Sequence, residues 1–195
     1  MEPIFVGIVG GTGAGKSTIS NMLQDKYPNK IGLIQLDDYF KSSTEVAEFK
    51  GFRNWDHPNM LHFDKIVEDL SELSQGKSIT INTKNKKLNP EYKETGKKIS
   101  VELNPKPIIL VEGHFVLFDE RIRNFLDTSI WLDVDYETRW DRRVHFKYPE
   151  YKEKVLKPMH DKFVEPTKKY ADHIINASDL TKDQILKEVE KILFT

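Results

Sequence analysis

Apolar runs and amphipathic stretches alternate along the first part of the chain. Ile4 to Val9 is a short apolar run, typical of a buried parallel strand. Lys16 to about Tyr27 carries apolar residues at helical spacing and stops at Pro28. Ile31 to Leu36 is a second apolar run, and Phe63 to Ser74 places its apolar residues on one helical face. The pattern predicts strands that alternate with helices.

A segment of different character interrupts this pattern before it resumes. Residues 78–103 alternate apolar and polar positions, which predicts a β-hairpin. Its lysine-rich middle, Lys84 to Lys98, is expected to be a solvated tip. The remaining predicted strands are Pro107 to Glu112, Ser129 to Val134 and His173 to Asn176, and the remaining predicted helices are Tyr136 to about Lys147, Glu150 to Tyr170 and Thr181 to Phe194.

Strands that alternate with helices predict an α/β fold, in which a parallel sheet is covered by helices on both faces. Ligands of such sheets bind beyond the carboxyl ends of the strands. Gly10, Asp37, Glu112 and Asp133 all follow or end a predicted strand, so the fold is expected to bring them to one edge. The length of 195 residues suits a single domain over residues 1–195.

Composition narrows the classes of function. Hydrophobic residues make up 38% and charged residues 31%, which indicates a folded globular chain. The net charge of -1 offers no general basic field, so we expect no nucleic-acid partner. No apolar run approaches the roughly 20 residues that span a bilayer, and the N-terminus does not resemble a signal peptide, so we expect no membrane partner. The absence of cysteine excludes disulfides and fits a cytoplasmic location.

The strongest chemical signal is the segment GGTGAGKST, which matches the phosphate-loop pattern G-x-x-x-x-G-K-[ST]. The backbone N–H groups of such a loop turn inward on phosphates, and the following helix N-terminus favours negative charge. We expect Lys16 to reach the β- and γ-phosphates and Ser17 to ligate Mg²⁺. The predicted phosphate-binding residues are Gly10, Gly11, Thr12, Gly13, Ala14, Gly15, Lys16, Ser17 and Thr18.

Two acidic positions at strand ends are candidates for catalysis and metal binding. Asp37 follows the second strand, where a kinase that acts on a hydroxyl needs a carboxylate to accept the proton. Alternatively, Asp37 and Asp38 are loop carboxylates or helix caps. Glu112 ends a strand near the phosphate loop and is suited to hold Mg²⁺, although a buried glutamate paired to a neighbour has the same pattern.

Weaker candidates come from a turn and from a set of arginines. Asp56 lies in the constrained turn NWDHP, where its carboxylate is able to accept two hydrogen bonds from a sugar diol. Alternatively, Asp56 forms an Asx-turn that only caps the next segment. Arg139, Arg142 and Arg143 are spaced to share one helix face. Such arginines clamp transferring phosphates, or they form a solvated basic face.

Taken in order, these motifs resemble the uridine kinase and phosphoribulokinase family of P-loop kinases. The matching segments are GGTGAGKST, LDDYFK, NWDHP, IILVEGHFVL, the stretch from DERIR to RWDRRV, and FVEPTKKYADHII. They cover most of the chain outside residues 42–53 and the hairpin. The resemblance implies a three-layer P-loop fold with a five-stranded parallel sheet, helices on both faces, a hairpin over the acceptor and a short lid over residues 136–160.

The resemblance also implies the reaction and its residues. ATP with Mg²⁺ is the implied donor, and the 5′-hydroxyl of a nucleoside-like small molecule is the implied acceptor. The implied catalytic residues are Asp37, Lys16, Arg139 and Arg143, and the implied Mg²⁺ residues are Ser17 and Glu112. The acceptor is implied to contact Asp37, Tyr39, Asp56, His57, Tyr92 and Arg139. Arg142 and Asn176 are assigned to ATP, and Lys147 to the neighbourhood of the lid.

The hairpin and the lid depart from the uridine kinase pattern. Uridine kinases carry a hairpin tyrosine followed by a histidine and an arginine that help to read the pyrimidine, whereas residues 82–98 contain Tyr92 but no histidine or arginine. The short lid is similar to that of nicotinamide riboside kinases. We therefore expect uridine or cytidine as acceptor, with nicotinamide riboside or another small metabolite as the alternative. Selection of the base is expected to be weak, because stacking on Tyr92 tolerates any ring.

A different class of function also fits a phosphate loop, namely a non-catalytic nucleotide-binding switch. Asp37 argues against this class, because a switch needs no acceptor base. A guanine-reading N-K-x-D string is not found, since Asn85 to Leu88 fails at its last position. The sequence leaves a homo-oligomer open.

Overall fold

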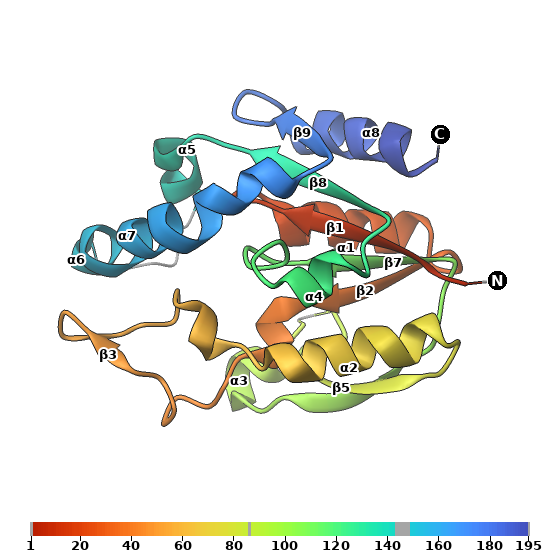
Figure 1. Cartoon of the computed structure of the whole chain (residues 1–195), viewed down its shortest axis with the longest axis horizontal. Helices are drawn as coiled ribbons and strands as arrows, with labels where there is room; N and C mark the ends of the chain where they lie inside the picture. The colour runs from red at the N-terminus through yellow and green to blue at the C-terminus, as the bar shows by residue number, and fades with distance from the viewer. Residues whose placement is uncertain (1, 86, 143–148, 195) are drawn as a thin grey trace.

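The chain folds around a five-stranded parallel sheet (Figure 1). The computed structural model describes residues 2–85, 87–142 and 149–194. The strand order is β2–β7–β1–β8–β9, and every neighbouring pair is parallel. The strands are β1 (Ile4–Val9), β2 (Ile31–Gln35), β7 (Ile108–Glu112), β8 (Thr128–Asp133) and β9 (His173–Asn176). The predicted α/β fold with a five-stranded parallel sheet is confirmed.

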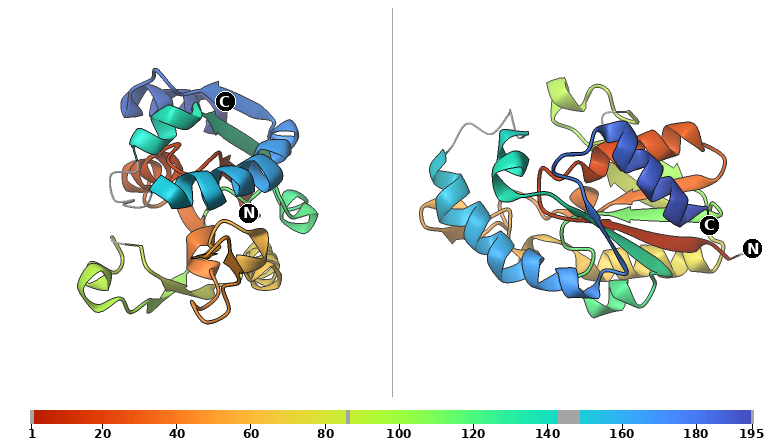
Figure 2. Two further views of the ribbon diagram at one scale, coloured as in Figure 1. Left: turned by 90° about the vertical axis from the view of Figure 1, so that its left-hand side faces the viewer. Right: turned by 90° about the horizontal axis from the view of Figure 1, so that it is seen from above.

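Helices cover both faces of this sheet (Figure 2). On one face, α1 (Lys16–Lys26) and α8 (Lys182–Leu193) pack onto the sheet through buried apolar side chains. On the other face, α2 (Phe63–Ser74) and the short α4 (Glu120–Arg123) contribute to a second apolar cluster. Burial of these two apolar layers fixes the sheet between the helices. No described helix is both long and apolar enough to cross a membrane.

The predicted hairpin is present and most described residues of its tip are exposed, as predicted, but the tip also contains a helical turn. Strands β5 (Ile79–Thr83) and β6 (Ile99–Leu103) pair antiparallel with Ile79 opposite Leu103. The connection contains the helical turn α3 (Tyr92–Thr95), which the alternation of residue types did not predict. The amide of Asn89, which is buried, donates to the carbonyl of Thr83 at 3.2 Å and to that of Lys97 at 2.9 Å. These bonds close the tip back onto its own strands.

Short elements connect β2 to α2. They are the 3₁₀ turn η1 (Leu36–Tyr39), the small antiparallel ribbon of β3 (Glu48–Phe49) and β4 (Phe52–Arg53), and the 3₁₀ turn η2 (Pro58–Met60). Figure 1 shows the ribbon next to α6 (Pro149–Tyr151). Phe49 and Phe52 of the ribbon pack against the apolar side chains of the helical region after β8, and the rings of Phe52 and Tyr151 lie 5.7 Å apart. This pair of elements encloses the carboxyl edge of the sheet from two sides.

The helical region after β8 is less regular than the sequence predicts. The described part of the first helix is α5 (Tyr136–Asp141), and residues 143–148 of the predicted helix lie outside the described residues. The second predicted helix is a run of five pieces: α6 (Pro149–Tyr151), the π turn η3 (Lys152–Leu156), α7 (Lys157–Met159), the π turn η4 (His160–Val164) and the 3₁₀ turn η5 (Glu165–Tyr170). Pro158 and Pro166 lack the N–H that an α-helix needs, which accounts for the altered bonding around them.

Candidate active site

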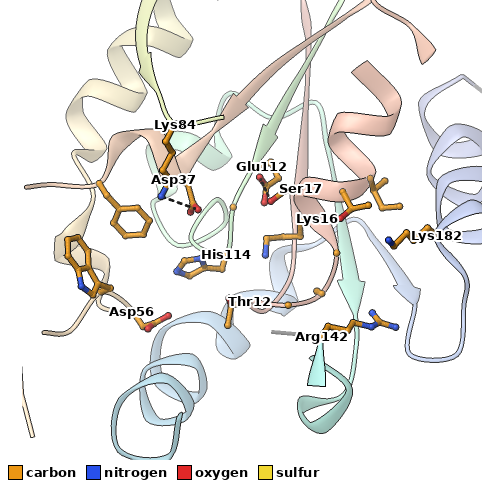
Figure 3. Close-up of a pocket in the computed structure, with 18 of the residues that line it drawn as sticks. Thr12, Lys16, Ser17, Asp37, Asp56, Lys84, Glu112, His114, Arg142 and Lys182 are labelled. Atoms are coloured by element: carbon orange, nitrogen blue, oxygen red, sulfur yellow. Dashed lines mark hydrogen bonds and ion pairs between the residues drawn. The ribbon is translucent and has the colours of Figure 1, made fainter. Parts of the chain in front are cut away.

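A cavity of about 1250 Å³ runs along the carboxyl edge of the sheet. Arg142 and Lys182 lie at one end of it, Asp56 and Lys84 lie at the other, and the phosphate loop lies between them (Figure 3). Parallel strands bring their carboxyl ends together, so loops that are distant in sequence meet here. Such an elongated cavity has room for two ligands that meet at the phosphate loop.

The phosphate loop follows β1 and ends at the first turn of α1. Gly10 has a φ of 139°, and a Cβ there would lie 2.6 Å from the Leu132 carbonyl oxygen, so the tight exit from β1 requires glycine. Gly15 has a φ of 93° and is the N-cap of α1. The first residues of α1 therefore line the cavity together with the loop. The Lys16 side chain is buried, and its Nζ donates to the Gly11 carbonyl at 3.0 Å. Such features are typical of an anion-binding loop.

Of the predicted phosphate-binding residues, most face the cavity. The lining residues from this loop are Thr12, Gly13, Ala14, Gly15, Lys16, Ser17 and Thr18. Gly10 and Gly11 lie behind them, where Gly11 packs against the guanidinium of Arg139. Their contribution is to shape the loop rather than to line the cavity.

Ser17 and Glu112 meet beside the phosphate loop. The Ser17 hydroxyl donates to Glu112 Oε2 at 3.0 Å, and the Gln35 amide donates to the same oxygen at 3.0 Å. Burial raises the pKa of the Glu112 carboxyl, and the nearby Lys16 ammonium opposes that rise. A cation at this point would stabilise the charged carboxylate, and hydroxyl and carboxylate oxygens are ligands that a hard divalent cation takes.

The protein itself supplies few ligands for such a cation. Within the described residues, no group of three or more histidine, aspartate, glutamate or cysteine side chains is arranged to hold a metal. A cation held at Ser17 and Glu112 would therefore take its remaining ligands from phosphate oxygens and water, as Mg²⁺ commonly does.

The two aspartates of η1 have different surroundings. Asp37 lines the cavity, its side chain is 53% exposed, and its Oδ2 lies 3.5 Å from the Lys84 ammonium. Asp38 turns toward the hairpin and accepts a hydrogen bond from the Lys84 backbone N–H at 2.9 Å. Burial raises the pKa of Asp38. Asp37 is thus the carboxylate of this pair that faces the phosphate loop across the cavity (Figure 3).

Aromatic rings and Asp56 line the far end of the cavity. The rings belong to Phe40, Phe52, Trp55, Tyr92 and Tyr151. Asp56 Oδ2 accepts a hydrogen bond of 2.7 Å from the Tyr151 hydroxyl, which itself accepts one of 3.2 Å from the Trp55 backbone N–H. Tyr151 comes from α6, so this network joins the helical region after β8 to the loop that carries Asp56. Nothing in the sequence around Tyr151 marks it as a site residue.

Replacement of Tyr151 by phenylalanine tests this network. Tyr151→Phe keeps the ring but removes the hydroxyl that orients Asp56, so we expect the KM for the acceptor to rise about 10-fold, as for a hydrogen bond to a charged group. The kcat and the KM for ATP should change less than about 2-fold, because the hydroxyl lies away from the phosphate loop. Tyr170→Phe, at an exposed tyrosine outside the cavity, is the matched control. An unchanged KM for the acceptor would contradict the assigned role.

The arginines do not form one exposed face. Arg139 is only 6% exposed and lies behind the phosphate loop, where its Nε donates to the Val134 carbonyl at 3.0 Å. Its Nη2 lies 3.1 Å from Nε2 of His160. Burial and the adjacent guanidinium lower the pKa of His160 to about 3, so the ring is neutral and accepts this hydrogen bond. The described contacts of Arg139 therefore support the loop, and its role toward phosphate or acceptor stays a prediction.

The other basic residues of this region have different positions. Arg142 lines the cavity and its Nη2 donates to the Ser178 carbonyl at 3.2 Å. Arg143 and Lys147 lie outside the described residues. Arg142 is the C-cap of α5 and is exposed, whereas Arg139 is buried.

Three further predicted residues lie outside the wall of the cavity. The buried Tyr39 donates its hydroxyl to Asp69 at 2.8 Å, so it points into the core. His57 accepts the Asn59 backbone N–H at 3.1 Å and caps η2. Asn176 ends β9, and the lining residues near it come from the next segment instead. The assigned ligand contacts of Tyr39, His57 and Asn176 stay predictions.

Several lining residues were not predicted from the sequence. At the Arg142 end they are Leu180, Thr181, Lys182 and Ile185 from the start of α8. At the other end, Lys84 and Lys98 line the cavity although the lysine-rich middle of the hairpin was expected to be solvated. They lie directly beyond β5 and before β6, and the hairpin packs both of them against η1. The Thr181–Gln184 capping box predicts where α8 begins, but not that its first turn faces a ligand.

The chain matches a known family over most of its length. Residues 5–182 match the model of the phosphoribulokinase / uridine kinase family. The chain belongs to this family. As a member, it is a phosphotransferase that acts on a hydroxyl group, with ATP as the phosphate donor that its P-loop fold implies.

Individual relatives and a solved structure agree with this membership. A protein named uridine kinase from Clostridium novyi (strain NT) is 38% identical and is matched over 99% of this chain and 98% of its own length. A protein of the same name from Streptococcus gordonii is 34% identical over 98% and 96%. A solved structure titled a possible uridine kinase from Bacillus stearothermophilus has a TM-score of 0.65 at 16% identity, with 90% of each chain covered, and supports the fold.

Proposed function

We propose that the chain transfers the γ-phosphate of Mg²⁺-bound ATP to the 5′-hydroxyl of a nucleoside, with uridine or cytidine as the first candidates. One observation carries the proposal: the Asp37 carboxylate and the phosphate loop with Lys16 open onto the same cavity. A protein that only binds nucleotide needs no acceptor base at that position. The printed names of the relatives, which are uridine kinases, support this choice of acceptor.

The donor occupies the half of the cavity between Arg142 and the phosphate loop. The loop N–H groups and Lys16 hold the β- and γ-phosphates, and the first turn of α8 lies beside the nucleoside part of ATP. Ser17 and Glu112 would hold Mg²⁺. When bound, this ion would neutralise part of the negative charge of the phosphates. The buried Glu112 carboxylate and the exposed Ser17 hydroxyl fit this ion, because both are oxygen ligands, and burial disfavours an uncompensated charge on the carboxylate.

The acceptor occupies the aromatic half of the cavity. Its 5′-hydroxyl lies at Asp37, and the carboxylate takes the hydroxyl proton while the oxygen forms a bond to the γ-phosphorus. The bond from that phosphorus to the β-phosphate oxygen breaks, and ADP leaves with the electron pair. Asp56 accepts hydrogen bonds from the sugar hydroxyls, and the ring lies among Phe40, Trp55 and Tyr92.

The region after β8 acts as the lid in this proposal. Tyr151, from α6, already reaches Asp56 across the cavity, which supports a lid that closes on the acceptor rather than on ATP alone. Closure of such a segment excludes water and limits wasteful hydrolysis. The lid of residues 136–160 includes the undescribed residues 143–148 and stays a proposal.

An acceptor panel separates this function from its alternatives. Protein, ATP and Mg²⁺ are mixed with uridine, cytidine, nicotinamide riboside or no acceptor, and ADP release is followed. We expect turnover that depends on a riboside, with acceptors that differ by less than roughly 10²-fold in kcat/KM because few fixed groups face the base. Best turnover with nicotinamide riboside would favour the alternative kinase. Nucleotide binding without acceptor-dependent turnover would favour a nucleotide-binding switch.

A further inference from the structure

Lys84 is held in a defined position at the acceptor end of the cavity. Its backbone N–H donates to Asp38, its ammonium lies 3.5 Å from Asp37 Oδ2, and that ammonium lies 5.4 Å from the centre of the Phe40 ring. Just before β6, Lys98 Nζ donates to the Asp38 carbonyl at 2.6 Å. Both sides of the hairpin connection, directly after β5 and directly before β6, are therefore tied to η1. A lysine usually lacks fixed geometry because its stem is flexible, but these contacts restrict this one.

The polar groups at this end of the cavity are unevenly distributed between donors and acceptors. Lys41, Arg53, Lys84 and Lys98 line it and are donors only. The carboxylates at this end are Asp37 and Asp56, which the proposed reaction uses for sugar hydroxyls, whereas Glu112 lies beside Ser17. Among the described residues, no asparagine or glutamine side chain lines this cavity. The rings of Phe40 and Trp55 contact each other edge to face, with centroids 6.2 Å apart. An acceptor ring that enters beside them thus meets mainly N–H donors and positive charge, together with the Tyr92 hydroxyl.

We propose that Lys84 is a specificity-determining residue that donates a hydrogen bond to the acceptor ring at the position where uridine has a carbonyl oxygen and cytidine has an amino group. The ammonium has three N–H donors, so it keeps one on Asp37 and offers another to the ring. Lys84 then favours rings that present carbonyl oxygens over rings that present amino groups at the same place. This inference rests on the proposed function and names the part of the acceptor that the hairpin reads.

Two preferences among ribosides follow. Uridine, which has a carbonyl where cytidine has an amino group, is the better acceptor, because an amino group cannot accept from an ammonium. Nicotinamide riboside carries a positive charge on its ring, and the cations at this end of the cavity repel it. Both preferences are modest, since Lys84 is partly exposed to water, with 33% of its side chain accessible.

The test compares kcat/KM for uridine, cytidine and nicotinamide riboside in the wild type, Lys84→Met, Lys84→Arg and Lys93→Met. Methionine keeps the length of the stem but not the charge, arginine keeps a donor, and Lys93 is an exposed lysine of the same hairpin outside the cavity. We expect a wild-type preference for uridine over cytidine of about 10-fold. In Lys84→Met this preference should fall below about 2-fold, mainly through a higher KM for uridine, while Lys84→Arg retains part of it and Lys93→Met all of it.

The outcomes distinguish this inference from the proposed function. A lack of turnover with every riboside would overturn both. Wild-type turnover with equal use of uridine and cytidine would overturn the role of Lys84 alone. An equal loss of kcat for all ribosides in Lys84→Met, with the preference unchanged, would also overturn it, because Lys84 would then act only through Asp37. A thermal unfolding midpoint for each variant, measured with an ATP analogue, shows that the comparison is made on folded protein.

Discussion

Lys16→Ala is expected to abolish phosphate transfer, with a loss in kcat of about 10³-fold or more, because a preorganised positive charge inside the phosphate loop is removed. Lys16 is buried in the loop and its Nζ lies at the Gly11 carbonyl, where no other described lining residue of the loop brings a cation. Water that fills the space has neither the charge nor the fixed position of the ammonium. ADP release with a saturating acceptor measures the loss.

The control for this variant is Lys26→Ala. Lys26 ends the same helix, but its side chain is 51% exposed and pairs with Glu190 on α8, away from the cavity. We expect Lys26→Ala to retain activity within about 2-fold, as surface ion pairs contribute little. Near-normal turnover by a folded Lys16→Ala protein, judged from its circular dichroism and melting curve, would remove the basis for a phosphate-loop kinase.

Asp37→Asn is expected to lower kcat by about 10²–10⁴-fold, the range for loss of a general base. Asparagine has nearly the same shape but cannot take the hydroxyl proton, so the KM for ATP should change little. Asp37 is the η1 carboxylate that faces the cavity, and its Oδ2 contacts Lys84 without being buried. Steady-state rates with varied ATP and varied acceptor separate the two effects.

The neighbouring Asp38 is the matched control. It accepts the Lys84 backbone N–H through a side-chain oxygen that asparagine also provides. Burial raises the pKa of Asp38, against the opposing effect of its hydrogen bonds and of Lys84 and Lys98. We therefore expect Asp38→Asn to retain kcat within about 5-fold. If Asp37→Asn instead weakened ATP·Mg²⁺ binding and left kcat nearly intact, Asp37 would belong to the metal site rather than to the acceptor.

The fold was predictable because its signals are local. The strand Ile4–Val9 and the helix Phe63–Ser74 have the bounds that the apolar pattern predicts, since a continuous apolar run and a helical stripe each need only neighbouring residues. The irregular run from Pro149 to Tyr170 was predicted as helix but not as π and 3₁₀ turns. Once the structure is known, the prolines of this run account for the π and 3₁₀ turns. They did not predict them, because proline inside a helical pattern is compatible with several local geometries.

The site was predictable where a motif fixes the backbone conformation. It was less predictable where the orientation of a side chain depends on its packing. The phosphate loop is shaped by its glycines, so the position of Lys16 follows from the pattern. Tyr39 and Arg139 belong to equally clear motifs, yet Tyr39 turns to Asp69 in the core and Arg139 lies behind the loop. Those directions depend on packing between elements, which the spacing of residues does not contain.

Residues outside motifs were missed for a related reason. Tyr151 and Lys84 enter the cavity because α6 and the hairpin fold over the carboxyl edge from opposite sides. Neither has a spacing that distinguishes it from a surface residue. Once the topology is known, the residues that follow β5 become candidates, because the hairpin is tied to η1 there.

The most direct test of the central claim is identification of the reaction product. The protein is incubated with ATP, Mg²⁺ and uridine, and the mixture is followed by ³¹P NMR. We predict that the γ-phosphate signal of ATP is replaced by that of a phosphate monoester coupled to the 5′-methylene protons of the riboside, in equal amount to ADP. ADP that appears with inorganic phosphate alone, or no consumption of ATP with any riboside, would contradict the account.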